Sequence, residues 1–301
     1  MLRRTTRRSG FITIIVLVLV LVIEILRSAK DPLWLAISHS KPHNGAMNQL
    51  LRRSLAVMLL AVGAFLLVIV TAEAITFGVP DGNGHPNTGG LVAPQAYSDG
   101  TWLYCSGTLI SPTVFLTAAH CDEGTSRVTV TFDTAYQAGD KTYVGTWHAD
   151  PLYGHDNSDP HDIAVVVFDK PIKGIYPAQL PIAGSLSALQ HGQQFTSVGY
   201  GAYEVTNQPG GHRYLYNDVR GVATGTLNSV SPSWLRISMN PATGNGGTCY
   251  GDSGGPNFLG TTNIVAATTI TGDAVCRATN TVYRLDTNSA RAFLRQFVVL
   301  P

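Results

Sequence analysis

Three short stretches of the sequence carry side chains that could act together in catalysis. The string Gly-Asp-Ser-Gly-Gly-Pro at Gly251–Pro256 places a serine hydroxyl in a glycine-rich turn. A serine hydroxyl is a poor nucleophile unless a neighbouring base takes its proton. His120, within Thr-Ala-Ala-His-Cys, offers that base, and Asp162, at the start of an apolar run, offers an acid to orient the imidazole. Ser253, His120 and Asp162 together predict nucleophilic catalysis.

Each stretch taken singly also has a structural interpretation. A Gly-Asp-Ser-Gly-Gly string is often only a turn. A histidine beside a cysteine is usually structural, and Asp162 could cap the entry to a strand. These interpretations would have to hold for all three stretches of one chain, so the catalytic interpretation is favoured.

Short strands must position these residues, because apolar runs alternate with Gly, Pro, Asn and Asp from Ile75 onward. Strands are predicted at Arg127–Phe132, Ile163–Phe168, Phe195–Gly199, Trp234–Met239 and Asn263–Thr269. The unbroken apolar run Ile163–Phe168 is typical of a strand buried on both faces. Apolar residues at helical spacing predict one helix over residues 288–298, capped by Asn288. This pattern indicates an all-β barrel or sandwich, and no internal repeat is evident.

Composition excludes several classes of protein. Of 301 residues, 45% are hydrophobic and 13% are charged, which excludes a disordered chain, and 31 glycines without a three-residue period exclude collagen. Residues 75–301 hold 11 Lys/Arg against 16 Asp/Glu, a net charge of −5. Because nucleic-acid binding requires clustered basic residues, no nucleic-acid partner is expected.

The N-terminal quarter resembles a targeting segment. Its apolar runs, Phe11–Ile23 and Leu55–Val70, are shorter than the ~20 residues that span a bilayer. Residues 47–74 have the order of a signal peptide: Arg52 and Arg53, then the second apolar run, then Ala-Glu-Ala. Residues 1–46 are then an upstream extension, or alternatively a signal anchor. The extension predicts a secreted protein, extracellular or periplasmic, with only transient membrane contact, whereas the anchor predicts a protein tethered to the membrane. Four cysteines in an exported chain suggest two disulfides.

In the order His120, Asp162, Ser253, the motifs resemble the trypsin/chymotrypsin family of serine endopeptidases, in its bacterial secreted form. Supporting motifs are Cys105–Ile110 before the histidine, Gly199–Gly201, and Val282-Tyr283 after the last cysteine. The resemblance covers about residues 75–298. It implies two Greek-key six-stranded β-barrels, one over about 75–180 and one over about 181–287, with a short C-terminal helix.

The resemblance also implies roles for single residues. Ser253 would attack the scissile carbonyl of a protein or peptide substrate, His120 would carry the proton, and Asp162 would orient the histidine. The backbone N–H groups of Gly251 and Ser253 would bind the oxyanion. No cofactor or metal is implied, and the chain is expected to act as a monomer.

Disulfides and activation follow from the same resemblance. The implied pairs are Cys105–Cys121 and Cys249–Cys276. Members of the family are commonly activated when cleavage frees an Ile or Val ammonium, which pairs with the aspartate before the nucleophile. Ile75 follows Ala74 of the cleavage pattern directly, so signal removal itself would create the pair Ile75–Asp252.

The specificity pocket is expected near Gly247, Thr248 and Thr281. Gly247 and Thr248 offer no acid for Lys or Arg, and Thr281 would make the pocket shallow. Cleavage after small or medium apolar residues is therefore expected. The family's Ser-Trp-Gly edge is replaced somewhere within residues 266–271, where Thr269 would support Asp162.

Three alternatives remain open at this stage. The chain could be a catalytically silent, protease-like binding module, or a protease that keeps residues 1–46 as a membrane anchor. Separately, an acidic loop could hold calcium or a transition metal, although its spacing matches no known motif; its residues are His148, Asp150, His155, Asp156 and Asp159.

Overall fold

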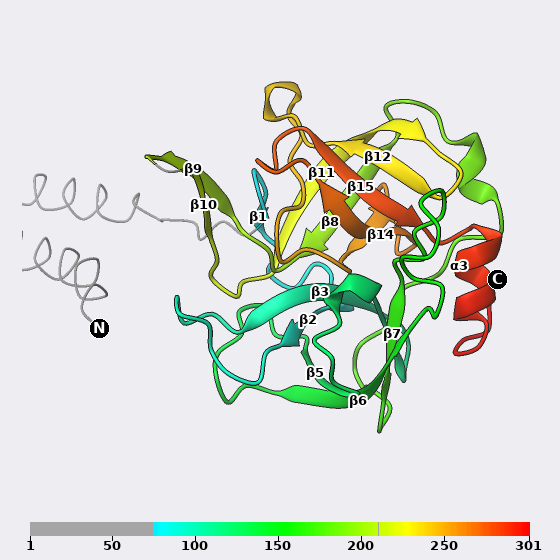
Figure 1. Cartoon of the computed structure of the whole chain (residues 1–301), viewed down its shortest axis with the longest axis horizontal. Helices are drawn as coiled ribbons and strands as arrows, with labels where there is room; N and C mark the ends of the chain where they lie inside the picture. The colour runs from blue at the N-terminus through cyan, green and yellow to red at the C-terminus, as the bar shows by residue number, and fades with distance from the viewer. Residues whose placement is uncertain (1–74, 210) are drawn as a thin grey trace, which may run out of the picture. The chain divides into compact units, whose positions relative to one another are not determined.

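Two β-barrels lie side by side in the computed structural model, which describes residues 75–209 and 211–301 (Figure 1). The predicted extension or anchor (1–46) and signal peptide (47–74) lie outside the described residues. Within the described part, no helix is long and apolar enough to cross a bilayer. The all-β fold with two six-stranded barrels and a short C-terminal helix is confirmed.

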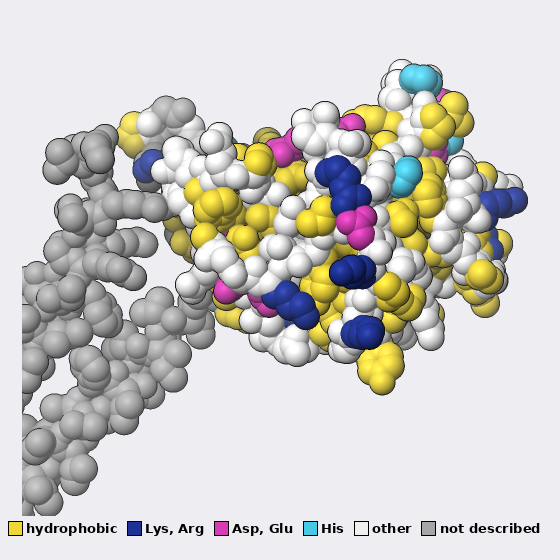
Figure 2. Space-filling model, turned by 90° about the horizontal axis from the view of Figure 1, so that it is seen from below, with side chains coloured by type: hydrophobic (Ala, Val, Ile, Leu, Met, Phe, Trp, Pro, Cys, Tyr) yellow, Lys and Arg dark blue, Asp and Glu magenta, His cyan; other side chains and the backbone are white. Residues whose placement is uncertain are grey.

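The first barrel closes in the strand order β2-β3-β4-β7-β6-β5. Its strands are β2 (Thr88–Val92), β3 (Leu103–Ser111), β4 (Val114–Thr117), β5 (Arg127–Thr131), β6 (Thr142–Ala149) and β7 (Ala164–Phe168). β4 pairs with β7 rather than with β5, which is the crossover of a Greek key. In β5 the alternation buries Val128 and Val130 and exposes Arg127, which pairs with Asp169. Figure 2 shows this barrel from below, where basic, acidic, polar and apolar side chains are mixed on its surface.

The second barrel repeats this topology. Its strands are β8 (Gln194–Gly199), β11 (Gly221–Val230), β12 (Trp234–Ser238), β13 (Pro256–Leu259), β14 (Val265–Gly272) and β15 (Thr279–Arg284). They run in the order β8-β11-β12-β15-β14-β13, and pairing of β13 with β8 closes the ring. β1 (Val79–Pro80) extends this sheet by pairing with β11, although it precedes the first barrel in the chain. The hairpin β9 (Glu204–Gln208) and β10 (Gly211–Leu215) projects from the body (Figure 1).

A shared hydrophobic core joins the barrels. Val165 of β7 packs in this core between the barrels, whereas its neighbour Val166 packs inside the first barrel. Both residues are wholly buried, which explains the unbroken apolar run seen in the sequence. Helix α3 (Asn288–Leu294) covers the shared core with Phe293. Its cap is Thr287, whose hydroxyl accepts the N–H of Ala290, rather than the predicted Asn288.

A buried arginine also ties the barrels together. Arg220, just before β11, is wholly inaccessible to solvent. Its Nε donates to Asp81 at 2.9 Å, and one terminal nitrogen donates to the carbonyls of Thr88 (3.0 Å) and Phe132 (3.1 Å) in the first barrel. A buried charge is tolerated only when it is paired and hydrogen-bonded in this way. Arg220 therefore fixes the relation between the barrels near the start of β2.

Candidate active site

His120 and Asp162 are brought together by the pairing of β4 with β7. Thr117 at the end of β4 pairs with Ala164 at the start of β7, and the two residues lie just beyond these ends. His120 lies in the 3-10 turn Ala119–Cys121, and its backbone N–H donates to Asp162 Oδ1 at 3.0 Å. Its ring Nδ1 lies 2.7 Å from Asp162 Oδ2. An ionised carboxylate only accepts, so with Asp162 ionised this contact requires the proton on Nδ1, and among the described residues Nε2 makes no hydrogen bond.

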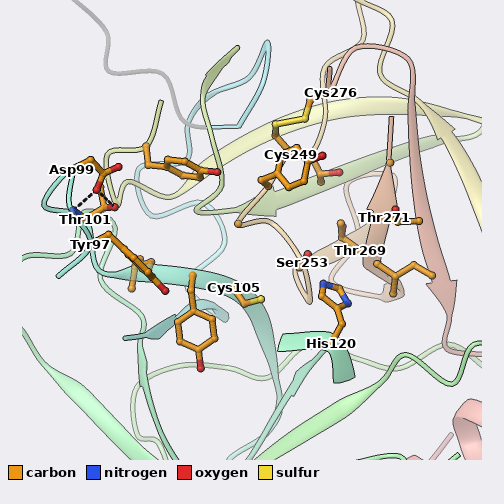
Figure 3. A pocket seen from close by; sticks show the side chains of 18 of the residues that line it. Tyr97, Asp99, Thr101, Cys105, His120, Cys249, Ser253, Thr269, Thr271 and Cys276 are labelled. Atoms are coloured by element: carbon orange, nitrogen blue, oxygen red, sulfur yellow. Dashed lines mark hydrogen bonds between the residues drawn. A yellow bond between two sulfur atoms is a disulfide. The ribbon is translucent and has the colours of Figure 1, made fainter. Parts of the chain in front are cut away.

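Ser253 reaches the same place from the second barrel. It lies in the loop before β13, and its carbonyl accepts the N–H of Ser106 in β3 at 2.8 Å. The neighbouring Gly254 has a φ of +80°, and a Cβ there would lie 2.1 Å from Thr117 Oγ1. Only glycine lets this loop approach the first barrel so closely. Ser253 and His120 thus line the same cavity (Figure 3), and among the described residues no hydrogen bond joins their side chains.

A cavity of about 610 Å³ connects these side chains (Figure 3). One wall is the nucleophile loop, from Thr248 to Ser253, and the opposite wall is Thr269–Asp273 at the end of β14. A third part, which the sequence did not point to, is lined by Tyr97, Asp99, Thr101, Tyr104 and Tyr216. No motif marks these residues: Tyr104 is near the start of β3, and the other four lie in loops without apolar periodicity.

Two backbone donors in this cavity have no acceptor. Among the described residues, the N–H groups of Gly251 and Ser253 donate to no protein group, although both residues line the cavity. Gly251 has a φ of +95°, a conformation that favours glycine. Two unpaired donors of this kind can bind an oxygen that develops negative charge.

The carboxyl of Asp252, the residue directly before Ser253, is wholly buried. Burial raises the pKa of Asp252 to about 7, although the N–H groups of Cys249 and Gly201 each donate to it at 2.8 Å and favour the charged form. A Cβ at Gly199 or Gly201 would lie within 2.4 Å of this carboxylate. The Gly-Tyr-Gly motif therefore leaves the space that Asp252 occupies.

Ile75, the predicted partner of Asp252, is buried in the same region. The next residue, Thr76, donates from its hydroxyl to the carbonyl of Ala202 at 3.2 Å. Ala202 directly follows Gly201, which donates to Asp252. Among the described residues no ion pair joins Ile75 to Asp252. In the full-length chain Ile75 is an amide, because Ala74 precedes it.

Of the predicted pocket residues, the structure brings only Thr248 to the cavity wall. Gly247 packs against Met239, whose side chain a Cβ at position 247 would contact at 2.4 Å. Thr281 lies within β15, paired with Arg236 of β12 and Thr271 of β14. On the side of the cavity where Thr281 was expected, the lining residues come from β14, which lies between β15 and β13 in the sheet.

The Thr269 hydroxyl engages a different partner from the predicted one. It accepts a hydrogen bond from Asn257 Nδ2 at 3.0 Å, and in the described part of the chain no hydrogen bond joins it to Asp162. Asn257 is wholly buried and also accepts from Ser197 at 2.7 Å and from Asn280 at 2.9 Å. Thr269 is therefore held by the polar centre of the second barrel.

Asp273, an acid on the cavity wall, already accepts hydrogen bonds from three backbone N–H groups. Burial alone would raise its pKa, but backbone N–H groups of Arg277, Ala278 and Thr279 hold the pKa of Asp273 below its ordinary value. These donors lie at 2.8 to 3.0 Å. Asp273 thus shapes the turn after β14 and leaves little capacity for a cationic substrate group.

Carboxylates of the acidic loop before Asp162 already have protein partners. Asp150 lies 3.0 Å from His161 Nδ1, and Asp159 accepts from the Tyr283 hydroxyl at 2.8 Å. Among the described residues, the three side chains whose donor atoms come close enough to hold a metal are Cys105, His120 and Cys121. The two cysteines are joined as a disulfide, as are Cys249 and Cys276, which is the pairing that the resemblance implies. The loop therefore offers no support for a metal site.

Comparisons with known proteins agree with this geometry. The family model described as Trypsin matches residues 83–292. The chain is 27% identical over 190 residues to a chymotrypsin of Phaedon cochleariae, covering 60% of this chain and 67% of the relative. It is 30% identical over 173 residues to a trypsin of the same organism, covering 52% and 64%. The matched segments thus span about two thirds of these relatives.

Solved structures share the fold at low sequence identity. HL collagenase aligns with a TM-score of 0.56 and 18% identity over 76% of this chain and 97% of that one. A protein named HBP aligns with a TM-score of 0.57 and 15% identity over 75% and 98%. These likenesses support the architecture, and the match of the family model to most of the described residues identifies the sequence: the chain belongs to the trypsin family.

Proposed function

We propose that the protein is a serine endopeptidase in which Ser253 is the nucleophile, His120 the general base and Asp162 the group that orients it. Membership of the trypsin family supports a protease that acts on proteins or peptides. The observation that carries the proposal is the two-point contact of Asp162 with His120, at 3.0 and 2.7 Å, beside the cavity that holds Ser253. This contact leaves Nε2 free to accept the Ser253 proton.

The reaction follows from these positions. His120 takes the Ser253 proton as Oγ attacks the scissile carbonyl, then returns it to the leaving amine, and water repeats the sequence on the acyl-enzyme. The free N–H groups of Gly251 and Ser253 stabilise the oxyanion in both halves of the reaction. Asp162 keeps the histidine in the required tautomer and stabilises the imidazolium.

We further propose cleavage after small or medium apolar residues. This is supported by the threonine-rich walls of the cavity, to which Thr248, Thr269 and Thr271 contribute. The neighbouring carboxylate of Asp273 already accepts three backbone N–H groups, so few of its lone pairs remain for direct hydrogen bonds to a Lys or Arg side chain.

Export and activation belong to the same proposal. Removal of residues 47–74 as a signal peptide would release a chain that begins at Ile75. Its ammonium would then neutralise Asp252, whose raised pKa reports an uncompensated buried carboxyl. N-terminal sequencing of active protein from the medium checks this, and a start elsewhere than Ile75 contradicts it. Fractionation of cells places the activity in the pellet instead if residues 1–46 serve as an anchor.

A fluorophosphonate label tests the central claim, because it reacts only with an activated serine. The protein should be labelled at Ser253, and Ser253→Ala should abolish both labelling and cleavage of a peptide library. A wild-type protein with intact disulfides that neither labels nor cleaves any peptide would refute the proposal and favour the silent binding module.

A further inference from the structure

Ser106 is a side chain of the first barrel that contacts the loop bearing the nucleophile. It lies in β3 directly after Cys105 and is wholly buried. Its hydroxyl donates to the carbonyl of Gly251 at 3.0 Å and accepts the N–H of Tyr200 at 3.0 Å. The one hydroxyl thus joins the first barrel to two separate segments of the second.

The contacts of Ser106 fall on both residues whose N–H groups are free in the cavity. Its hydroxyl holds the Gly251 carbonyl, and its backbone N–H holds the Ser253 carbonyl at 2.8 Å. The Asp252 N–H donates to Cys249 at 3.0 Å. The peptide plane between Gly251 and Asp252 is therefore fixed at both of its polar atoms, and Ser106 supplies one of the two bonds.

Gly251 needs such a restraint more than another residue would. Its φ of +95° lies in a region that only glycine enters easily, and glycine has many alternative values of ψ. Rotation of this peptide plane would move the neighbouring N–H groups away from a common focus. A Cβ at position 251 would lie 2.9 Å from Gly201 Cα, so a stiffer residue cannot replace the glycine.

We propose that the Ser106 hydroxyl is a positioning residue of the oxyanion site: by holding the Gly251 carbonyl, it keeps the N–H groups of Gly251 and Ser253 directed at one point. The inference rests on the proposed function of Ser253. Ser106 is not among the residues that line the cavity, so its effect falls on stabilisation of the developing oxyanion rather than on ground-state binding.

We expect Ser106→Ala to lower kcat less than the removal of an oxyanion donor would. Removal of an oxyanion donor itself costs roughly 10²–10³-fold in kcat. Ser106→Ala leaves both donors present but removes one restraint on them, so we expect a fall in kcat of about tenfold, with KM unchanged within about twofold. A peptide aldehyde, whose adduct with Ser253 places an oxygen in the site, should lose affinity in parallel. The matching peptide alcohol, which forms no adduct, should not.

Thr108→Val is the matched control. Thr108 lies two residues further along β3, is equally buried, and its hydroxyl has no hydrogen-bond partner among the described atoms. Thr108→Val therefore removes a β3 hydroxyl that is as buried as that of Ser106, but it leaves the hydrogen bonds of the Gly251 and Ser253 carbonyls in place. Activity of this variant should equal that of the wild type.

The experiment measures kcat, KM and both inhibition constants for wild type, Ser106→Ala and Thr108→Val, using a peptide chosen from the library. If Ser106→Ala does not fold, judged by near-UV circular dichroism, Ser106→Gly removes the same hydroxyl and must show the same split. An unchanged kcat, or equal losses for the aldehyde and the alcohol, overturns the inference while the proposed function stands. An inert wild type overturns the proposed function first.

Discussion

The buried carboxyl of Asp252 makes the proposed activation measurable as a change in stability with pH. Two forms of the chain are compared in the Ser253→Ala background, which prevents self-digestion. One begins at Ile75, and the other begins one residue earlier at Ala74. Both have the same number of charges, but only the first places an ammonium at the position expected to pair with Asp252.

The magnitude follows from the raised pKa. Without an ammonium partner, the Asp252 pKa is about 7 in the folded chain against an ordinary value of 3.8. A pKa raised by folding contributes stability that is fully present below the unfolded value and is lost as pH rises through the folded value. At about 1.4 kcal/mol per pKa unit, the form starting at Ala74 loses about 3 kcal/mol from this group between pH 4 and pH 7, where half of the folded-state carboxyl is still protonated.

The form starting at Ile75 should escape this loss, because its ammonium favours the ionised carboxyl. Urea unfolding at pH 4 to 7 gives both free energies, with far-UV and near-UV probes used to check for a single transition. The difference between the forms should grow by about 3 kcal/mol over this range. Other acids cancel because both forms contain them.

Asp252→Asn is the control, since it should remove the pH-dependent difference from the pair of forms. The reasoning is refuted if the two forms respond identically to pH, or if their difference persists when residue 252 is asparagine. A constant offset at every pH would show that the extra alanine acts through packing and not through charge.

Three further predictions concern the site and its frame. Asp162→Asn should reduce kcat by about 10⁴-fold with little change in KM, since the histidine tautomer is lost; a loss below tenfold in steady-state kinetics contradicts the assigned role. Arg220→Met should lower the free energy of urea unfolding by about 3–5 kcal/mol, because buried Asp81 loses its guanidinium partner and keeps only His85, while the Thr88 and Phe132 carbonyls lose their donor; a cost below about 1 kcal/mol argues against the tie between barrels. Gly254→Ala should abolish activity and destabilise the fold far more than Gly124→Ala, which shares a positive φ but has open space around it; equal costs would exclude the close approach.

Local sequence patterns predicted much of the architecture. The apolar run at Ile163–Phe168 and the alternation at Arg127–Phe132 correspond to β7 and β5 almost residue for residue. Both patterns report burial, which a strand expresses in its own side chains. β14 was less well placed: it begins at Val265, two residues after the predicted start, and runs to Gly272.

The irregular register of β14 explains why the individual residues of one cavity wall could not be predicted. Its pairing with β15 shifts between Thr269 and Thr271, so an extra residue interrupts the alternation. A one-residue shift exchanges the two faces of a strand. From the sequence this wall could therefore be given only as a range, residues 266–271, and the structure brings Thr269, Ile270 and Thr271 of that range to the cavity.

The amino-acid sequence by itself determined which groups are available for chemistry: a serine in a glycine-rich turn, a histidine and an aspartate in distinctive local settings, and four cysteines. Only the tertiary structure decided that two barrels of identical strand order arise from a chain without an evident repeat. It alone gave Ser106 its contact with Gly251 across 145 positions of sequence. Residue types and short-range spacing can be read from a few neighbouring residues, whereas a hydrogen bond between the barrels depends on how every intervening strand pairs and packs.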